Sequence, residues 1–184
     1  MSTSPATPAV TTWNIDPAHS AAEFKVKHMM ISNVKGKFSG LSGALSLDES
    51  DVTRSSVAAS IPVATISTGD AQRDGHLKSA DFFDAEKFPA LAFTSTAVKR
   101  SGDGELAVTG NLSMHGVTKT VTFAVEGPSA PAKDPWGNLR VGLSATAKIN
   151  RKDFGLTWNS ALETGGVLVG EEVTISLDVE FIKA

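Results

Sequence analysis

Large apolar residues alternate with polar residues along most of this chain, which is the pattern of β-strands with one buried face. The clearest case lies between residues 173 and 181, where odd positions such as Val173 and Phe181 are apolar and even positions such as Asp178 are polar. The same period of two is found at residues 24–27, 38–47, 57–66, 91–94, 106–114, 121–125 and 139–150. We therefore expect about eight or nine antiparallel strands, arranged as a closed barrel or as a sandwich.

Three segments depart from this regular alternation. The parity changes at Gly40 and Leu41, which predicts a β-bulge, and Pro62 predicts an edge or irregular position. Between residues 70 and 83 the alternation stops, and Asp70 can cap a short helix that lies over the sheet. Since a glycine in a helix costs about 1 kcal/mol relative to alanine, a glycine inside this segment limits it to a short helix or a few helical turns.

Composition restricts the domain organisation and the class of partner. The 184 residues suffice for one domain and are too few for two ordinary ones. Residues 1–10 contain few large apolar side chains, so we predict a disordered tail over 1–10 and a single domain over 11–184. The tail lacks the basic and apolar regions of a secretory signal, which predicts a cytoplasmic protein. A net charge of -3 offers no basic excess for binding nucleic acid.

Catalytic chemistry finds little support in the sequence. It has no nucleophile elbow, no phosphate-binding loop and no dinucleotide fingerprint, and it contains no cysteine. The four histidines, at positions 19, 28, 76 and 115, are not spaced as metal-binding pairs, so a metal site would have to assemble across strands. We therefore expect no catalytic residue, no metal and no cofactor, and a protein that is not an enzyme.

Two groups of polar residues admit a functional and a structural interpretation. His28 follows Phe24 and Val26 on the predicted inward face, where it is either a core histidine with satisfied nitrogens or a polar anchor inside a cavity. Arg73 and His76 belong to a charged cluster that is either a solvated helix face or a rim over a cavity mouth. The structural interpretation is slightly favoured for both groups.

Several ordered motifs closely resemble those of the YceI-like family of polyisoprenoid-binding proteins, and together they extend from about residue 13 to residue 181. The motifs are residues 13–20 (WNIDPAHS), 24–28 (FKVKH), 67–69, 73–77, 81–84 (DFFD), 88–89, 109–112, 115–119, 134–137 (DPWG) and 150–155 (NRKDFG). Their number and order make a chance match improbable.

The resemblance implies a lipocalin-like, eight-stranded antiparallel β-barrel whose lumen holds a long isoprenoid chain, and it implies a homodimer. The expected ligand is a prenyl pyrophosphate or a prenylated quinone, which the protein carries or stores, with transient membrane contact. The expected ligand-binding residues are Phe24, Val26, His28, Phe38, Arg73, His76, Leu77, Phe82, Phe83, Phe93, Leu112, Phe123, Val141, Leu143 and Phe154. The alternative is a small-molecule enzyme that uses histidines at the barrel mouth, with or without a metal.

Overall fold

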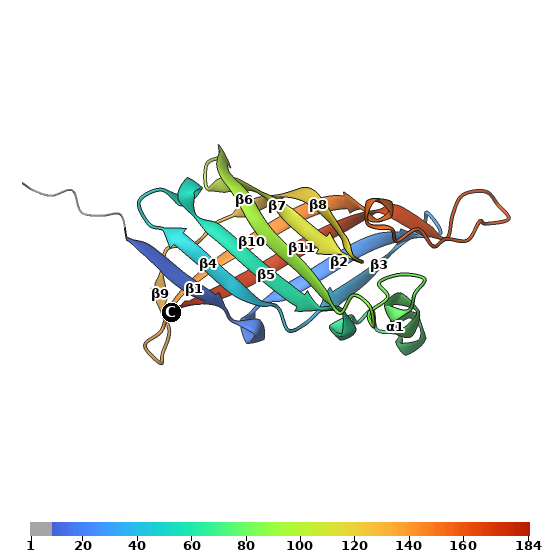
Figure 1. Cartoon of the computed structure of the whole chain (residues 1–184), viewed down its shortest axis with the longest axis horizontal. Coiled ribbons are helices and arrows are strands. Elements are labelled where there is room, and N and C mark those ends of the chain that lie inside the picture. Colours follow the sequence, from blue (N-terminus) through green and yellow to red (C-terminus); the bar gives the residue numbers. More distant parts are fainter. Residues whose placement is uncertain (1–8) are drawn as a thin grey trace, which may run out of the picture.

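The computed structural model describes residues 9–184, and these residues form mainly antiparallel β-structure (Figure 1). The strands are β1 (Val10–Ile15), β2 (Ala21–His28), β3 (Ser32–Phe38), β4 (Ser42–Asp48), β5 (Ser56–Pro62), β6 (Ala90–Gly102), β7 (Glu105–Met114), β8 (Val117–Glu126), β9 (Ala132–Lys133), β10 (Leu139–Asn150) and β11 (Val169–Lys183). One α-helix, α1 (Ala71–Lys78), accompanies the 3₁₀ turns η1 (Pro17–His19), η2 (Val52–Arg54), η3 (Val63–Thr65) and η4 (Arg151–Phe154). A disordered tail is predicted over residues 1–10. Residues 1–8 of this tail lie outside the described residues, and Val10 belongs to β1.

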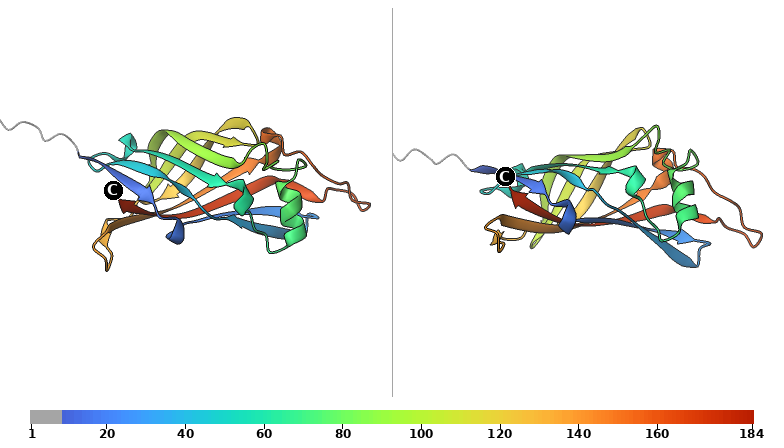
Figure 2. Two further views of the ribbon diagram at one scale, coloured as in Figure 1. Left: turned by 60° about the horizontal axis from the view of Figure 1, so that its bottom comes forward. Right: turned by 90° about the horizontal axis from the view of Figure 1, so that it is seen from below.

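The sheet closes on itself because β11 pairs with β10 along one edge and with β2 and then β1 along the other. β1 and β2 lie end to end along β11. On the side away from β11, β4 pairs with β1 and β3 pairs with β2, so β4 and β3 also lie end to end. β1 with β2 counts as one interrupted strand, and β4 with β3 counts as another. Together with β5, β6, β7, β8, β10 and β11 they form an eight-stranded antiparallel barrel (Figures 1 and 2). The predicted barrel is thus confirmed, and the sandwich is not formed.

The β-bulge predicted at Gly40 and Leu41 is not formed, and the change of parity there is instead the break between β3 and β4. Gly40 adopts a left-handed φ of 73° there, a conformation that glycine reaches without steric cost. The break lets one continuous stretch of chain contribute to the barrel twice, first beside β2 and then beside β1. The segment predicted as one strand over residues 57–66 is correct only as far as Pro62, because the chain turns into η3 after that residue.

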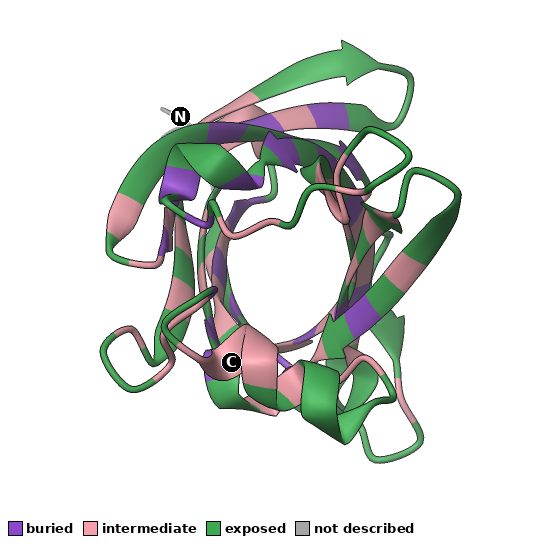
Figure 3. Ribbon diagram, turned by 90° about the vertical axis from the view of Figure 1, so that its right-hand side faces the viewer, coloured by how far each residue is buried: buried purple, intermediate pink, exposed green. Residues whose placement is uncertain are grey.

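One end of the barrel is completed by irregular chain rather than by strand pairing. β5 ends at Pro62, so at this end no strand of residues 9–184 lies on the outer side of β3, where the pairing is an isolated bridge between Lys37 and Ser67. η3, α1 and the turns that follow occupy this position, and α1 lies at the rim of the ring of strands (Figure 3). Asp70 caps α1 as predicted by accepting a hydrogen bond from the Arg73 amide (2.9 Å), but the helix ends at residue 78.

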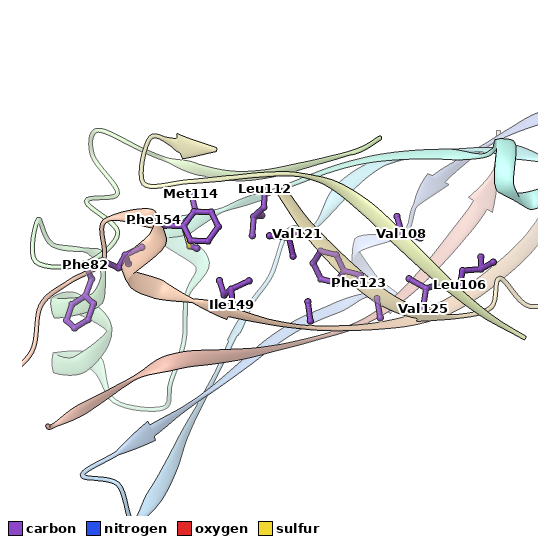
Figure 4. Close-up of a cluster of buried hydrophobic side chains, with 13 residues drawn as sticks. Phe82, Leu106, Val108, Leu112, Met114, Val121, Phe123, Val125, Ile149 and Phe154 are labelled. Atoms are coloured by element: carbon purple, nitrogen blue, oxygen red, sulfur yellow. The ribbon is translucent and has the colours of Figure 1, made fainter. Parts of the chain in front are cut away.

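Inward-facing apolar residues pack into two clusters. One contains Phe82, Phe123 and Phe154 and follows β7, β8 and β10 along the barrel, as Figure 4 shows. The other surrounds Trp13 and Phe181, whose exposed fractions are 0% and 1%. No helix in the described residues is long and apolar enough to cross a membrane.

Candidate ligand-binding cavity

A cavity of about 270 Å³ lies inside the barrel. It is lined by side chains from both ends of the barrel, including Phe82 at one end of the cluster in Figure 4 and Leu106 at the other. Its wall is almost entirely apolar. An elongated apolar space of this kind accommodates hydrocarbon and offers very few partners to a polar group.

Aromatic rings form much of the wall near α1. The ring of Phe24 covers Gly36 on the neighbouring strand so closely that a side chain at position 36 would collide with it. The centroids of Phe24 and Phe38 lie 5.7 Å apart, and Phe38 meets Phe83 edge to face at 6.0 Å. β2, β3 and the turn after α1 are thereby connected by packed rings, which offset the strand pairing that this part of the barrel lacks.

Ten of the expected ligand-binding residues line the cavity. They are Phe24, Val26, Phe38, Leu77, Phe82, Phe83, Phe93, Leu112, Phe123 and Leu143. Lys25 and Lys27 are exposed, so the register predicted for β2 is correct. This agreement follows from geometry, because successive side chains of a strand point to opposite faces of the sheet.

The other five expected residues lie outside the cavity wall. Val141 and Phe154 have the expected inward direction, but neighbouring side chains enclose them completely, with exposed fractions of 2% and 1%. His28 is half-buried at the end of β2, opposite Ser32 and Val169, and its side chain makes no hydrogen bond to any described residue. It is therefore not a core histidine with satisfied nitrogens, and it does not line the cavity, while a contact with a ligand stays a prediction.

The two charged candidates of α1 also bind neighbours outside the cavity. Arg73 donates to the side-chain and backbone oxygens of Thr68, at 2.7 and 2.9 Å. His76 pairs with Asp81 through Nε2 and Oδ2 at 2.8 Å, and its ring contacts Phe82 and Trp158 edge to face. These contacts connect the helix to the adjoining turns, which supports the structural interpretation of the cluster.

Arg151 is a site residue that was missing from the sequence-based candidates. It lines the cavity and is only 5% exposed. Its Nε donates to the carbonyl of Gly170 (2.7 Å), its Nη1 to Leu156 (2.7 Å) and Trp158 (2.9 Å), and its Nη2 to Val169 (3.2 Å). Burial lowers the pKa of its guanidinium. Position 151 continues the odd-numbered inward parity of β10, and this signal could have identified it.

These hydrogen bonds direct the guanidinium of Arg151 towards the backbone of residues 156–170. Asn159 supports the same loop, since its amide nitrogen donates to the Val169 carbonyl (2.7 Å) and its oxygen accepts from the Val169 amide (3.0 Å). Arg151 consequently holds the loop against the barrel. Its charge is dispersed over four carbonyl oxygens, and the cavity wall stays apolar next to it.

A second charged cluster lies away from the cavity, around Arg140. Its Nη1 donates to Asp16 Oδ2 (2.7 Å) and Glu180 Oε1 (2.8 Å), and its Nε donates to Asp134 Oδ2 (2.7 Å). His19 Nδ1 lies 2.8 Å from the same Asp16 oxygen. Ligand atoms of Asp16, His19 and Glu180 come within 4.8 Å of one another, but the guanidinium of Arg140 already forms ion pairs with both carboxylates. The cluster connects η1, the loop before β10, and β11.

Arg140 makes this connection sensitive to acid. Its hydrogen bond, followed by that of His19, lowers the pKa of Asp16 to about 2 from the ordinary 3.8. Burial opposes the ionisation of Asp134, but hydrogen bonds from Arg140 and Asn138 outweigh it and lower that pKa to about 2. Carboxyls with a lowered folded-state pKa stabilise the protein above their unfolded pKa, and this stabilisation is lost as pH falls through the folded value.

We therefore expect the melting temperature of the unaltered protein to fall between pH 4 and pH 2, the window between the two values. Arg140→Met should lower the melting temperature at pH 7 and make it fall less across that window. Lys148→Met is the control, because the Lys148–Glu172 pair is exposed and 3.8 Å long and should contribute little. Thermal unfolding followed by circular dichroism at several pH values measures both effects, and equal slopes for all three proteins would contradict the assignment.

The closed barrel and its long apolar cavity define the class of protein, a small β-barrel with an internal binding space. The YceI-like domain matches residues 13–181. A UPF0312 protein of Staphylococcus aureus is 37% identical over 172 residues, which cover 94% of this chain and 98% of that protein. The chain belongs to the YceI-like family.

Solved structures agree with this assignment. BcnA of Burkholderia cenocepacia superposes with a TM-score of 0.77 at 25% identity, covering 90% of this chain and 98% of BcnA. A domain of Saccharophagus degradans described as polyisoprenoid-binding has the same fold, with a TM-score of 0.67 at 15% identity over 96% of this chain and all of that domain.

Proposed function

We propose that the protein binds the hydrocarbon chain of an isoprenoid lipid in the barrel cavity and carries or stores it. The observation that carries the proposal is the apolar wall, which continues from Phe82 to Leu106 with almost no polar surface. A polyisoprenoid ligand is attributed to the Saccharophagus degradans domain of the same fold, which supports this choice of ligand.

The wall selects the chain of the ligand and not its head group. Arg151, the cationic residue in the cavity wall, donates to backbone carbonyls, and Arg73 of α1 donates to Thr68. Neither residue presents a free cation to a pyrophosphate inside the cavity. We therefore expect the prenyl chain to lie in the barrel with the head group outside the apolar segment, so that a prenyl pyrophosphate and a prenylated quinone are bound with similar affinity.

Energetics favour exchange with membranes over permanent capture. Burying one five-carbon isoprene unit from water is worth about 4 kcal/mol, at ~0.8 kcal/mol per carbon. A long prenyl lipid, however, starts in a bilayer, and moving its chain between two apolar surroundings changes the hydrophobic free energy little. A carrier or store that exchanges ligand with membranes follows from this balance.

The histidines favour binding over the enzymatic alternative. His19 pairs with Asp16, His76 with Asp81, and His115 Nδ1 lies 3.0 Å from the Phe154 carbonyl oxygen. His28 stands apart at the end of β2. No histidine lines the cavity, so the arrangement supports a binding role without catalysis.

Two measurements test the proposed function. Mass spectrometry of lipids extracted from untagged native protein is expected to find a prenyl chain. Displacement of an apolar fluorescent probe from the stripped protein should give affinities for geranylgeraniol and geranylgeranyl pyrophosphate that agree within about tenfold. A much stronger preference for the pyrophosphate would contradict the role of the wall, and absence of prenyl lipid together with failure of both ligands to bind would exclude the function itself.

A further inference from the structure

The turn between β2 and β3 exposes three consecutive apolar residues. Met29, Met30 and Ile31 have exposed fractions of 39%, 60% and 80%. Met29 and Met30 adopt left-handed φ angles of 52° and 63°, a conformation that asparagine and glycine reach more easily than methionine. Turn geometry therefore does not explain why these positions are apolar.

Four lysines lie behind this tip on the outer face of the same hairpin, two on each strand. Lys25, Lys27, Lys35 and Lys37 are all exposed, and Lys25 lies directly opposite Lys35 in the strand register. Among the described residues, none of the four makes an ion pair. The neighbouring Glu171 and Glu172 of β11 pair instead with Lys152 and Lys148, at 2.7 and 3.8 Å. The outer face of the hairpin therefore carries four lysines and one acidic residue, Glu23, which lies opposite Lys37, so it is a basic surface on a chain whose net charge is -3.

Protection of a free sheet edge explains only part of this arrangement. β3 is an edge strand at this end of the barrel, and lysines on an edge discourage pairing with another chain. Such protection gives no reason for an apolar tip. An apolar tip flanked by lysines is the combination that favours an interface with anionic head groups, where apolar side chains enter the boundary region and cations stay at the surface.

The geometry fits such an interface. The hairpin projects at the end of the barrel that carries α1 (Figure 2). A strand rises about 3.3 Å per residue, so Lys27 lies about 7 Å behind Met29, within the reach of a charged surface at physiological ionic strength. The inner face of the hairpin carries Phe24 and Val26, which line the cavity.

We infer that the β2–β3 hairpin docks the protein onto a membrane surface rich in anionic lipids, with Met29, Met30 and Ile31 inserted and with Lys27, Lys25 and Lys35 as the lysines that lie nearest to the head groups. This inference rests on the proposed function for its purpose, because docking here places the cavity wall next to the source of the lipid. The hairpin is also connected to the loop held by Arg151, since the Met29 amide donates to the Leu168 carbonyl at 2.8 Å.

Co-sedimentation of the full chain, stripped of lipid, with vesicles tests the docking. We expect binding to vesicles of phosphatidylcholine mixed with phosphatidylserine, and much weaker binding to phosphatidylcholine alone. Met30→Asn with Ile31→Ser should weaken binding at least about tenfold, and so should Lys25→Gln with Lys35→Gln. Both pairs should keep the melting temperature, because asparagine suits the φ of Met30 and the lysine pair opposes like charges.

Trp136→Ser is the matched control, since Trp136 is 79% exposed but lies in the loop before β10. Loss of binding in this variant, with normal binding by the hairpin variants, would overturn the inference. A change in oligomeric state without a change in vesicle binding would also overturn it and assign the hairpin to a contact between copies. Prenyl lipid content is measured on the same variants, so a protein that docks through the hairpin but holds no prenyl lipid refutes only the proposed function.

Discussion

Ala59→Phe is expected to reduce the amount of retained prenyl lipid at least about tenfold. Ala59 lies on β5 between Gly43 and Phe93 in the register, and its methyl group lines the cavity. A phenyl ring there occupies space that part of the chain would fill. Excluding one isoprene unit removes up to about 4 kcal/mol of burial, whereas a tenfold loss needs only about 1.4 kcal/mol.

Ala58→Phe is the matched control, because Ala58 is the preceding residue and faces outward on the same strand. Extraction and quantification of lipid from both variants, together with thermal unfolding, separate loss of space from loss of folding. Ala58→Phe should retain the normal amount of lipid, and both variants should stay folded, since the added ring of Ala59→Phe enters a cavity and not a filled core. Equal retention by the two variants would place the ligand outside the barrel.

Arg151→Met is expected to have the largest effect on stability, a loss of about 3 to 5 kcal/mol in the free energy of unfolding. Methionine fills a similar volume but leaves the carbonyls of Leu156, Trp158, Val169 and Gly170 without their donor. Hydrogen exchange should show faster opening of residues 156–170, and urea denaturation gives the free energy.

Two further variants define the origin of this effect. Arg151→Lys retains a charge and up to three donors, so it should recover part of the lost stability. Lys152→Met removes an exposed ion pair with Glu171 and should cost less than about 1 kcal/mol. If Arg151→Met were no less stable than Lys152→Met, the loop would be held by other contacts.

The sequence predicted most strands and the direction of most lumen residues, because a period of two records directly which face of a strand is buried. Phe24, Phe93 and Phe123 were assigned to the cavity wall in this way. Parity does not show where side chains close the lumen, so Val141 and Phe154 were assigned to the cavity although neighbouring residues cover them. The family motifs decided between barrel and sandwich, which alternation alone left open.

Contacts between distant segments could not be predicted from spacing. Arg140 joins Asp16, Asp134 and Glu180. Asp16 and Glu180 are more than a hundred residues apart in the sequence, and no local motif connects the three carboxylates. The end of α1 was also missed, because capping by Asp70 marks only where a helix begins. The structure of residues 79–89 depends on packing against β3, through contacts such as that between Phe38 and Phe83.

The position beside β3, where η3, α1 and the following turns take the place of a strand, has a consequence for kinetics. A ligand threaded through a barrel whose strands are paired all round can leave only through the ends or by breaking a ladder of backbone hydrogen bonds. Beside β3, the chain from η3 to residue 89 is held by aromatic side chains, by the Lys37–Ser67 bridge and by the hydrogen bonds between Thr65 and Ser39. Local opening of that segment disrupts few backbone hydrogen bonds, so its rate is independent of global unfolding. For the lipid ligand proposed above, this predicts release through local opening beside β3, at a rate that global stability does not set.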